Sequence, residues 1–345
     1  MKLKIAIFSA VCLVTNAAFA ADKVEQTFLK HPGVKKLQEE VRTKGWIVFS
    51  AFTDRKEWDL FLSRPDGSQR QRITNTPDWS EAAPRFSPNG KKILYRRIIK
   101  GKIISHDRWG FQGELVIADR DGKNAKVMGK RRQYTWACWN PDGSKLSCLS
   151  LRGIEVVSLN TMQVESKLKR NGVFQQLFWS PNGKWFVGTA NVGGVNWTIV
   201  RLDAKTGKRN IVSQFRNCTP DWFPDSKRVI FSNRPAGQSG SGWTQLWMAD
   251  AAGKSRKMIY GEDGRHIYGG ALSPDAKYVL FTRCPQDGGG SEREGAPAAL
   301  MRLSDGPIIG GTSAALRKSH SKDKVKDGPV LPLPNLWEPH WTYAE

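Results

Sequence analysis

The chain has 345 residues, of which 54 are lysine or arginine and 32 are aspartate or glutamate, so its formal net charge is +22 at neutral pH. Such an excess of positive charge attracts polyanions and anionic surfaces, but it carries no information about the fold. Nucleic acid is not expected as a partner, because the sequence contains no recognised nucleic-acid-binding module and its first residues indicate export.

Residues 1–20 predict a secretory signal peptide. Two lysines precede an apolar run over residues 5–14, and Ala18-Phe19-Ala20 supplies a cleavage site before Ala21. The run is too short to span a bilayer, and no other segment is apolar enough to enter one. Cys12 lies inside the run rather than at the cleavage site, so no lipoprotein anchor is expected. The sequence therefore predicts a periplasmic or secreted protein without a transmembrane segment.

Residues 21–44 form a short extension before the first expected strand. This stretch has room for one or two short helices, and residues 34–42, which follow Pro32-Gly33, are the better candidate. We therefore expect a helical extension at 21–44 and a single repeat domain at 45–345.

A five-residue phrase recurs along the rest of the chain. It reads FSPNG at 86–90, WNPDG at 139–143, WSPNG at 179–183, WFPDS at 222–226 and LSPDA at 272–276. The aromatic residue or leucine ends a strand, proline presets the first corner of a tight turn, the Asn or Asp side chain caps the turn, and glycine accepts positive φ. A short run rich in β-formers follows each phrase, at 92–96, 145–148, 185–187, 228–231 and 278–281. Each phrase therefore predicts a buried hairpin.

Third strands follow these hairpins, and a second polar turn then leads to a fourth strand. The third strands are expected at 59–62, 114–117, 154–157, 198–200, 245–247 and 299–301. Four strands per unit, at a period of 40 to 53 residues between the phrase prolines, is typical of a β-propeller blade. The fold class is therefore all-β, with antiparallel four-stranded blades.

The number of blades follows from the two ends of the repeat domain. Residues 45–50 look like a second strand with no first strand before them, and residues 339–343 look like a first strand with no second strand after them. Together they complete a sixth blade. Pairing the two ends in one blade removes the exposed strand edges that would invite aggregation, so the sequence predicts a six-bladed ring closed by its terminal strands.

The phrase, the short β run and the second turn resemble the TolB-type, WD-like β-propeller repeats of bacterial envelope proteins. The phrase is strong at Phe86, Trp139 and Trp179, degenerate at Trp222 and Leu272, and lost at the sixth position, Trp341. The resemblance covers residues 45–345 and implies a binding or scaffold module of the cell envelope. TolB carries an additional N-terminal α/β domain, whereas only residues 21–44 precede the first strand here.

The tryptophans of the phrase are expected to pack between blades. The four cysteines after residue 20 are Cys138, Cys148, Cys218 and Cys284, and none forms a C-x-x-C pair. A disulfide between Cys138 and Cys148 is compatible with export. The preferred interpretation is that these cysteines are small buried apolar residues.

The long connections indicate where a partner binds. They fall at 98–113, 234–243 and 284–297, between second and third strands, and a further insert at 311–338 is expected to join the last outer strand to the next inner one. In an up-and-down blade these connections emerge on one face of the disc, here called the long-loop face, and the hairpin turns emerge on the other. Loops longer than a scaffold needs are where binding function concentrates.

The long-loop face is therefore the candidate ligand-binding site, at the mouth of the central channel. Its aromatic and guanidinium side chains suit stacking and pairing with carboxylates. The predicted site residues are Arg55, Trp58, Trp79, Glu81, His106, Arg108, Trp109, Tyr134, Trp136, Arg234, Trp243, His266, Tyr268, Trp337 and His340.

Three functions compete: an envelope binding or scaffold protein, a binder of acidic polysaccharide, and a metal-dependent lyase of acidic oligosaccharides. Lyases of the last kind use seven blades, and the scattered histidines lack a second ligand at metal spacing. No G-x-S-x-G elbow is present. We therefore expect a monomeric binding module whose partner is an envelope protein or an acidic polysaccharide, with no catalytic residue, metal or cofactor.

Overall fold

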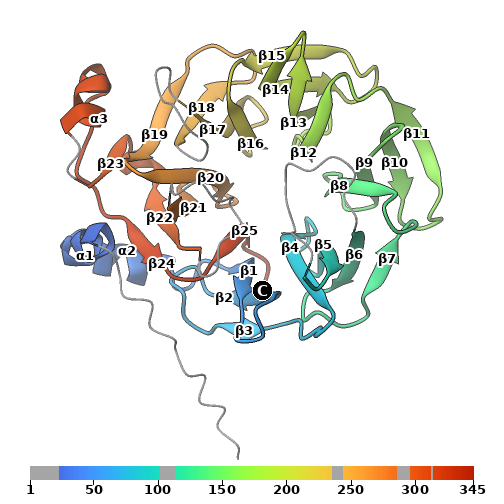
Figure 1. Ribbon diagram of the computed structural model, residues 1–345, viewed down its shortest axis with the longest axis horizontal. Coiled ribbons are helices and arrows are strands. Elements are labelled where there is room, and N and C mark those ends of the chain that lie inside the picture. The colour runs from blue at the N-terminus through green and yellow to red at the C-terminus, as the bar shows by residue number, and fades with distance from the viewer. Residues whose placement is uncertain (1–22, 102–112, 235–243, 286–295, 312–313) are drawn as a thin grey trace, which may run out of the picture.

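The protein is a ring of six β-sheets, each of which forms one blade around a central channel (Figure 1). The computed structural model describes residues 23–101, 113–234, 244–285, 296–311 and 314–345. Four strands of each blade run from the channel to the rim and pair antiparallel, and a fifth strand is added in parallel to one blade. The six-bladed propeller predicted from the sequence is therefore confirmed.

The first three blades contain the following strands, from the inner to the outer one. Blade 1 consists of β25 (Trp337–Thr342), β1 (Trp46–Phe52), β2 (Trp58–Ser63) and β3 (Gln71–Arg72). Blade 2 consists of β4 (Trp79–Phe86), β5 (Lys92–Ile99), β6 (Glu114–Asp119) and β7 (Lys126–Met128). Blade 3 consists of β8 (Tyr134–Trp139), β9 (Lys145–Ser150), β10 (Gly153–Ser158) and β11 (Val164–Leu168).

The other three blades follow the same order. Blade 4 consists of β12 (Val173–Trp179), β13 (Trp185–Val192), β14 (Val195–Asp203) and β15 (Arg209–Ser213). Blade 5 consists of β16 (Asn217–Trp222), β17 (Arg228–Asn233), β18 (Gln245–Asp250), β19 (Lys257–Glu262) and the added strand β23 (Ile308–Gly310). Blade 6 consists of β20 (Arg265–Leu272), β21 (Tyr278–Pro285), β22 (Ala298–Arg302) and β24 (Leu331–Leu333).

The ring closes through strands from opposite ends of the chain. Trp46 lies opposite Thr342, Ile47 opposite Trp341 and Val48 opposite His340, so the C-terminal strand is the inner strand of blade 1. The indole Nε1–H of Trp341 also donates to the carbonyl oxygen of Lys44 at 2.7 Å. The closure that the two orphan segments predicted is confirmed, and it pairs β1 on both of its edges.

The recurring phrase builds the turn between the first two strands of a blade. In blade 3, the Asp142 carboxylate accepts the backbone N–H of Ser144 at 2.7 Å, and Gly143 adopts a φ of 76°. The indole of Trp139 donates to the carbonyl oxygen of Arg85 in blade 2, at 3.3 Å. Trp222 likewise donates to Phe178 in blade 4, at 3.1 Å. The phrase therefore makes a turn, and in blades 3 and 5 it also bonds its blade to the preceding one.

The second turn of a blade packs closely against the backbone at the outer strand of the preceding blade. A Cβ atom at Gly122 would collide with the carbonyl oxygen of Ile73, and one at Gly253 would collide with that of Val212. Both glycines also have positive φ. Glycine is needed here for two reasons, because the turn requires a left-handed residue and a neighbouring backbone lies against it.

The insert near the C-terminus corrects one prediction. Residues 311–338 were expected to join the outer strand of the last blade to the next inner strand. Instead, β24 at Leu331–Leu333 is the outer strand of blade 6, and β23 at Ile308–Gly310 pairs in parallel with β19 of blade 5. The apolar Ile308 and Ile309 are buried there. After β22, the chain first forms β23 at the outer edge of blade 5 and then returns to form β24 of blade 6. The insert therefore lies between the third and fourth strands of blade 6.

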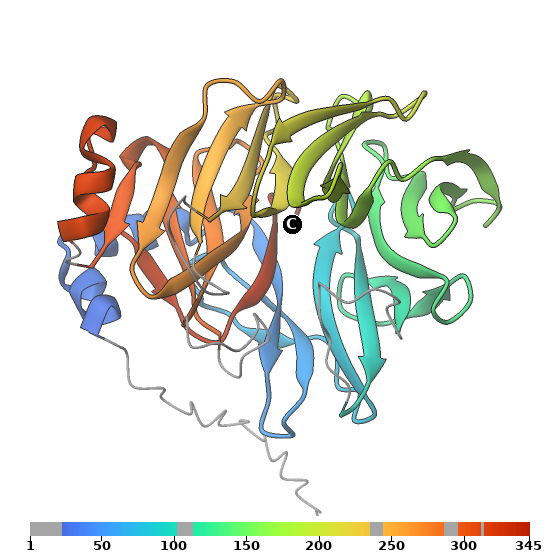
Figure 2. The ribbon, with the colours of Figure 1, turned by 45° about the horizontal axis from the view of Figure 1, so that its top comes forward.

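The N-terminal helices pack on the rim of blades 5 and 6. They are α1 (Lys23–Lys30) and α2 (Gly33–Val41), and both contact β24. Helix α3 (Ala314–Ser319) lies at the same edge of the ring (Figures 1 and 2). The structure also has two short 3₁₀ helices, Leu303–Asp305 and Ser321–Asp323. None of the helices in the described part of the chain is long and apolar enough to cross a membrane.

The four described cysteines form no disulfide with one another. Cys148 lies opposite Ala137 rather than opposite Cys138, so the two sulfurs belong to different faces of the blade. Cys138 packs between blades 3 and 4, whereas Cys148 packs between blades 2 and 3. Burial raises the pKa of the Cys138 thiol to about 12. They therefore act as small apolar residues and do not pair with each other.

Candidate functional site

The phrase defines two layers of residues along the central channel. The prolines of the five phrases surround one mouth of the channel, on the face of the hairpin turns. The residue immediately before the phrase belongs to the next layer, deeper in the channel. In ring order from blade 1, this layer consists of His340, Arg85, Cys138, Phe178, Asp221 and Ala271.

A bulge in each inner strand places these side chains. The pairing between first and second strands shifts register in every blade, as between Ala82 and Arg85 in blade 2. The residue three positions before the first residue of the phrase, or before Trp341 in blade 1, adopts a left-handed conformation in five blades, at Ala83, Gln176, Thr219, Gly269 and Glu338. Bulges of this kind re-aim side chains and recur next to functional sites. The five left-handed residues line a small cavity in the channel.

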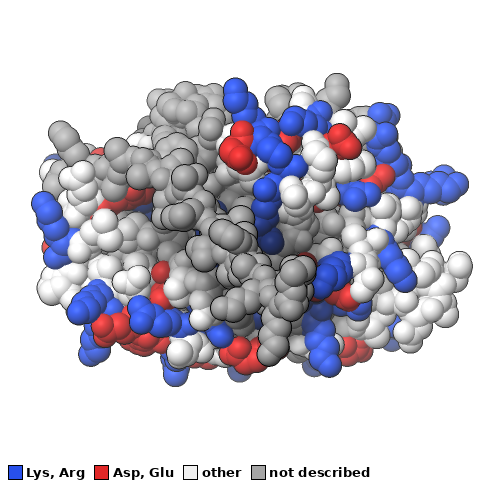
Figure 3. Space-filling view, turned by 90° about the horizontal axis from the view of Figure 1, so that it is seen from below, with Lys and Arg blue, Asp and Glu red and all other residues white. Residues whose placement is uncertain are grey.

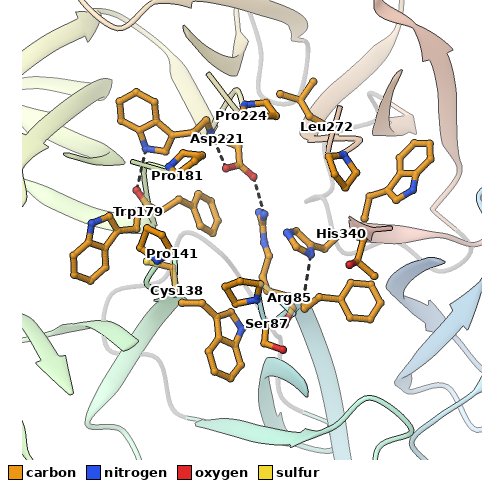
Figure 4. A pocket seen from close by; sticks show the side chains of 18 of the residues that line it. Arg85, Ser87, Cys138, Pro141, Trp179, Pro181, Asp221, Pro224, Leu272 and His340 are labelled. Carbon is orange, nitrogen blue, oxygen red and sulfur yellow. Dashed lines mark hydrogen bonds and ion pairs between the residues drawn. The ribbon is translucent and has the colours of Figure 1, made fainter. Parts of the chain in front are cut away.

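An ion pair closes the channel in its middle. Arg85 of blade 2 donates through Nη1 to Oδ2 of Asp221 in blade 5, at 2.7 Å. These blades stand on opposite sides of the ring, so the pair spans the channel (Figure 4). The guanidinium also lies 4.0 Å from the ring centre of Phe178, and Asp221 accepts the backbone N–H of Trp222 through Oδ1 at 2.7 Å. The three side chains separate a larger cavity from a small one of about 30 Å³.

The larger cavity is here called the proline funnel. Its volume is about 420 Å³, within the range of roughly 300–1,000 Å³ that is usual for ligand sites. The lining consists of Arg85, Phe86, Ser87, Pro88, Cys138, Trp139, Asn140, Pro141, Phe178, Trp179, Pro181, Asp221, Trp222, Pro224, Leu272, Ser273, Pro274, His340, Trp341 and Thr342. The wall is therefore mostly apolar, and the charged groups lie at the floor.

The floor remains partly open to solvent. The side chains of Arg85 and Asp221 are 21% and 22% exposed. At the rim, the prolines of the turns are exposed, and an exposed lysine follows four of the five turns, at Lys91, Lys184, Lys227 and Lys277. Asp142, Asp225 and Asp275 are exposed on the same set of turns. The funnel thus combines a rim of mixed charge with a small positive excess, an apolar wall and a charged floor.

His340 belongs to this floor, and not to the long-loop face where the sequence placed it. Its Nδ1 accepts the backbone N–H of Phe86 at 3.1 Å, beside Arg85 (Figure 4). Burial, and to a smaller extent the Arg85 guanidinium, lowers the pKa of His340 well below its ordinary value. The imidazole is therefore neutral near pH 7, and because Nδ1 accepts a hydrogen bond, the proton lies on Nε2. The error arose because the strand was read as starting at Pro339, whereas β25 starts at Trp337.

Three other predicted site residues come together between blades 1 and 2. Arg55 pairs with the buried Asp59 at 2.7 Å, and Trp79 carries the guanidinium of Arg97 at 4.2 Å from its ring centre. Glu81 is fully buried and accepts hydrogen bonds from the hydroxyls of Thr74 and Thr76. Burial raises the pKa of Glu81 to about 7, and the nearby negative charge of Asp59 adds to the shift. Arg55 and Trp79 remain partly exposed, but Glu81 does not.

Several predicted aromatic residues are part of the core. Trp58, Tyr268 and Trp337 are buried in one cluster, in which the Trp58 and Trp337 ring centres are 4.5 Å apart and the Trp337 indole donates to the Tyr268 hydroxyl. Tyr134 is buried and donates to Glu155 at 3.1 Å, and Trp136 is buried beneath the guanidinium of Arg96. These five side chains pack between strands, so they do not form an exposed rim.

The remaining predicted residues are only partly covered by the structure. His266 is half-buried on β20, where its Nδ1 lies 3.1 Å from the Thr244 hydroxyl. Arg234 follows β17 and is also half-buried, and burial lowers its pKa. His106, Arg108, Trp109 and Trp243 lie outside the described residues. Among the described residues, no three His, Cys, Asp or Glu side chains are placed to hold a metal ion.

Two exposed apolar residues on the long-loop face were not anticipated. Leu151, between β9 and β10, is 70% exposed, and Phe215, between β15 and β16, is 63% exposed. Phe215 and the following Arg216 both have positive φ, which is unusual for bulky residues and costs free energy. Lysine and arginine side chains are otherwise spread over the rim rather than collected in one patch on the side shown in Figure 3.

The floor of the funnel could have been found by aligning the phrases. The residue before each phrase is Arg85, Cys138, Phe178, Asp221 or Ala271, and His340 stands before the sixth position. Charged residues at this position in blades 2 and 5 face each other across a ring of six blades. The signal is therefore present, but it depends on knowing that this position points into the channel.

Solved structures share the fold. TolB from Acinetobacter baumannii superposes with a TM-score of 0.63 at 16% sequence identity, over 92% of this chain and 71% of that one. A TolB structure from Agrobacterium tumefaciens gives 0.56 at 18% identity, over 85% and 98% of the two chains. A chain of the nidogen–laminin complex gives 0.54 at 13% identity, over 75% and 90%. No protein-family model and no curated protein matches the sequence. The chain thus has a six-bladed β-propeller fold similar to that of the TolB propellers.

Proposed function

We propose that this chain is an exported propeller that acts as a binding or scaffold module in the cell envelope, with a polypeptide partner docked at the mouth of its central channel. The observation that carries the proposal is the proline funnel, a cavity of about 420 Å³ that the Arg85–Asp221 pair closes at its floor. A closed and largely apolar recess with few polar groups suits the binding of a ligand. The resemblance of the repeats to those of TolB and the predicted signal peptide at 1–20 support an envelope location.

The long-loop face is the second candidate for the docking surface. It carries the exposed Leu151 and Phe215, with Arg152 and Arg216 next to them in the chain. Exposed aromatic and guanidinium groups are the usual anchors of protein interfaces. Arg108 and Trp109, which the sequence predicted for this face, lie outside the described residues.

Pull-down experiments with variants of each face test the proposal. Purified residues 21–345 would be used to capture partners from an envelope extract, in parallel with three variants: Arg85→Gln/Asp221→Asn, Leu151→Ser/Phe215→Ser and Arg108→Ala/Trp109→Ala. Loss of a partner from the funnel variant alone would support docking at the funnel. Loss from the second or third variant alone would place the partner on the long-loop face.

An acidic polysaccharide is the alternative ligand, and the net charge of +22 is what favours it. Binding to such a polymer is dominated by charge, so it should weaken steeply with salt. If the purified chain is retained on immobilised polygalacturonate in a salt-sensitive way and no protein is captured, the ligand is an acidic glycan and not a polypeptide. If the pull-down captures no protein and the polygalacturonate column does not retain the chain, the binding-module proposal is wrong.

A further inference from the structure

We infer that the proline funnel binds the carboxyl-terminal end of an extended polypeptide, whose terminal carboxylate sits on Arg85 and His340 at the floor. This inference rests on the proposed function, and it names the chemical class of ligand for that same site.

The unused polar groups of the floor are hydrogen-bond donors. Arg85 gives one of its five N–H groups to Asp221 in the hydrogen bonds described. His340 uses Nδ1 to accept the Phe86 N–H, which leaves Nε2–H as a donor. The Asp221 carboxylate, by contrast, accepts from both Arg85 and the backbone of Trp222. A ligand group at this floor must therefore accept hydrogen bonds, and a carboxylate beside a guanidinium is the strong case.

The charge at the rim favours the same sign of ligand. Lys91, Lys184, Lys227 and Lys277 are exposed around the mouth, one after each turn. Asp142, Asp225 and Asp275 are on the same set of turns and keep their negative charge, so the four lysines exceed these aspartates by one. This small excess of positive charge favours the approach of an anionic group over that of a chain amino terminus or a lysine side chain.

The depth of the funnel distinguishes a chain end from an acidic side chain. In the inner strand of blade 2, the rim residue Pro88 follows the floor residue Arg85 by three positions. Because Pro88 lies in the turn after β4, the rise of about 3.3 Å per extended residue gives an upper limit, and the floor lies at most about 10 Å below the rim. An aspartate or glutamate on a partner that stays at the rim is too short to reach it. About three residues of an extended chain end cover the distance.

The wall favours a peptide over a sugar acid. Five prolines and the indoles of the phrase line it, with only a few hydroxyl and amide groups. A uronate ring carries hydroxyl groups on every side, and these would lose their water without gaining partners here. A peptide end with apolar side chains would bury apolar surface against the prolines and deliver a single charge to the floor.

The test compares free and amidated peptide ends. The probe is a library of N-acetylated hexapeptides with a free terminal carboxylate, matched to the same library with carboxamide ends. Binding to purified residues 21–345 is measured on arrays, and dissociation constants of the best sequences are then measured by fluorescence anisotropy. We expect peptides with apolar final residues to bind at least tenfold more tightly as carboxylates than as amides. An internal glutamate in an amidated peptide should not substitute for the free end.

Variants locate the carboxylate at the floor. Arg85→Gln/Asp221→Asn removes both charges together, so no unpaired charge is left in the channel, and the preference for the carboxylate should fall below about twofold. The matched control is Lys91→Ala/Lys277→Ala, which should slow association and leave the preference intact. Circular dichroism and thermal unfolding check that both variants fold. If the floor variant does not fold, the comparison of carboxylate and amide in the unchanged protein still decides the question.

Three results would overturn the inference. One is equal binding of carboxylates and amides, and another is an unchanged preference in a folded floor variant. The third is a library without any bound peptide, including the case in which a galacturonate pentamer binds instead. The proposed function survives each of these if the pull-down still captures a partner that the funnel variant loses. It fails only if that partner is absent as well.

Discussion

At the scale of single residues, the tryptophan of the repeated phrase has a role beyond filling space. Its indole lies between blades, and in Trp139 and Trp222 it donates a hydrogen bond to the backbone of the preceding blade. The acceptor is in each case the carbonyl of the residue that lines the channel floor, Arg85 or Phe178. The same residue therefore packs the ring and fixes the backbone of the candidate site.

Replacing Trp222 by phenylalanine should measure how much the hydrogen bond from its indole to the Phe178 carbonyl contributes to stability. The Phe178 carbonyl would lose its partner in a buried position, and we expect a loss of about 1–3 kcal/mol in the free energy of unfolding. The matched control is Trp185→Phe, since that indole is half-exposed and donates none of the hydrogen bonds described. Denaturant unfolding measures both variants. An equal and small loss in the two would show that the interblade bond contributes little.

Glu81 should make stability depend on pH. Its pKa is raised to about 7 in the folded protein, above about 4.3 in an unfolded chain. Between these values the folded state holds a proton that the unfolded state has released, so stability is greatest at low pH and falls as pH rises toward 7. At about 1.4 kcal/mol per pKa unit, the contribution is at most about 3–4 kcal/mol.

Glu81→Gln removes this titration and is the variant to compare. The difference in unfolding free energy between Glu81→Gln and the unchanged protein should change with pH between about 4.5 and 7.5. As pH rises through this range, the variant should lose less stability than the unchanged protein. Glu165→Gln is the control, because Glu165 is exposed and pairs with Lys145 at the surface. Parallel pH profiles for Glu81→Gln and the unchanged protein would show that Glu81 titrates normally.

At the scale of elements, the seam in blade 1 holds the ring together. The strand β25 pairs with β1 on one side, and its His340 accepts a hydrogen bond from Phe86 of blade 2 on the other. Trp341 is buried in the cluster that joins blades 1 and 6. The strand β25 therefore contacts both neighbouring blades and completes the ring.

Deleting residues 339–345 should be strongly destabilising. The deletion removes the buried Trp341 and opens the inner edge of β1, so the loss should exceed the 3–5 kcal/mol that is usual for a single Trp→Ala in a core. Deleting only residues 344–345 is the control, since these contribute hydrogen bonds to Arg120 and Arg64 at the surface. Thermal unfolding followed by calorimetry checks both. A seven-residue truncation that melts cooperatively near the parent temperature would contradict the seam.

At the scale of the whole molecule, the N-terminal helices belong to the same folded unit as the ring. Glu25 of α1 pairs with the fully buried Arg283 of blade 6 at 3.2 Å, and Arg283 also pairs with Glu262 of blade 5 at 2.7 Å. Glu40 of α2 accepts from Arg302 and from the Tyr278 hydroxyl. The helices and the strand β23 thus cover the outer side of blades 5 and 6.

Substitution of two leucines tests this unit. Leu37 of α2 is fully buried against blade 6, whereas Leu29 of α1 is 57% exposed. Leu37→Ala should therefore cost about 2–5 kcal/mol, and Leu29→Ala should cost no more than about 0.5 kcal/mol. Both values come from global unfolding of the propeller. If Leu37→Ala left that transition unchanged, the helices would unfold independently of the ring.

The repeated turns explain why so much of the fold could be predicted from the sequence. Proline, Asn or Asp, and glycine act through the local backbone, so five copies of the phrase predicted five hairpins whose second strands start at the residues observed, although these strands extend two to five residues further than expected. The two orphan strands then required a sixth blade. Closure between Trp46 and Thr342 follows from counting strands and needs no knowledge of side-chain contacts.

Only the tertiary structure decided which side chains reach the channel. A bulge shifts the register of each inner strand, and a shift by one residue exchanges the two faces of a strand. Alternation along the sequence therefore could not show that Trp58, Tyr268 and Trp337 are buried together while His340 faces the channel. The Arg85–Asp221 pair joins residues 136 positions apart, in opposite blades. Local chemistry determined the turns and the number of blades, whereas the closed floor of the funnel exists only because the ring brings its two sides together.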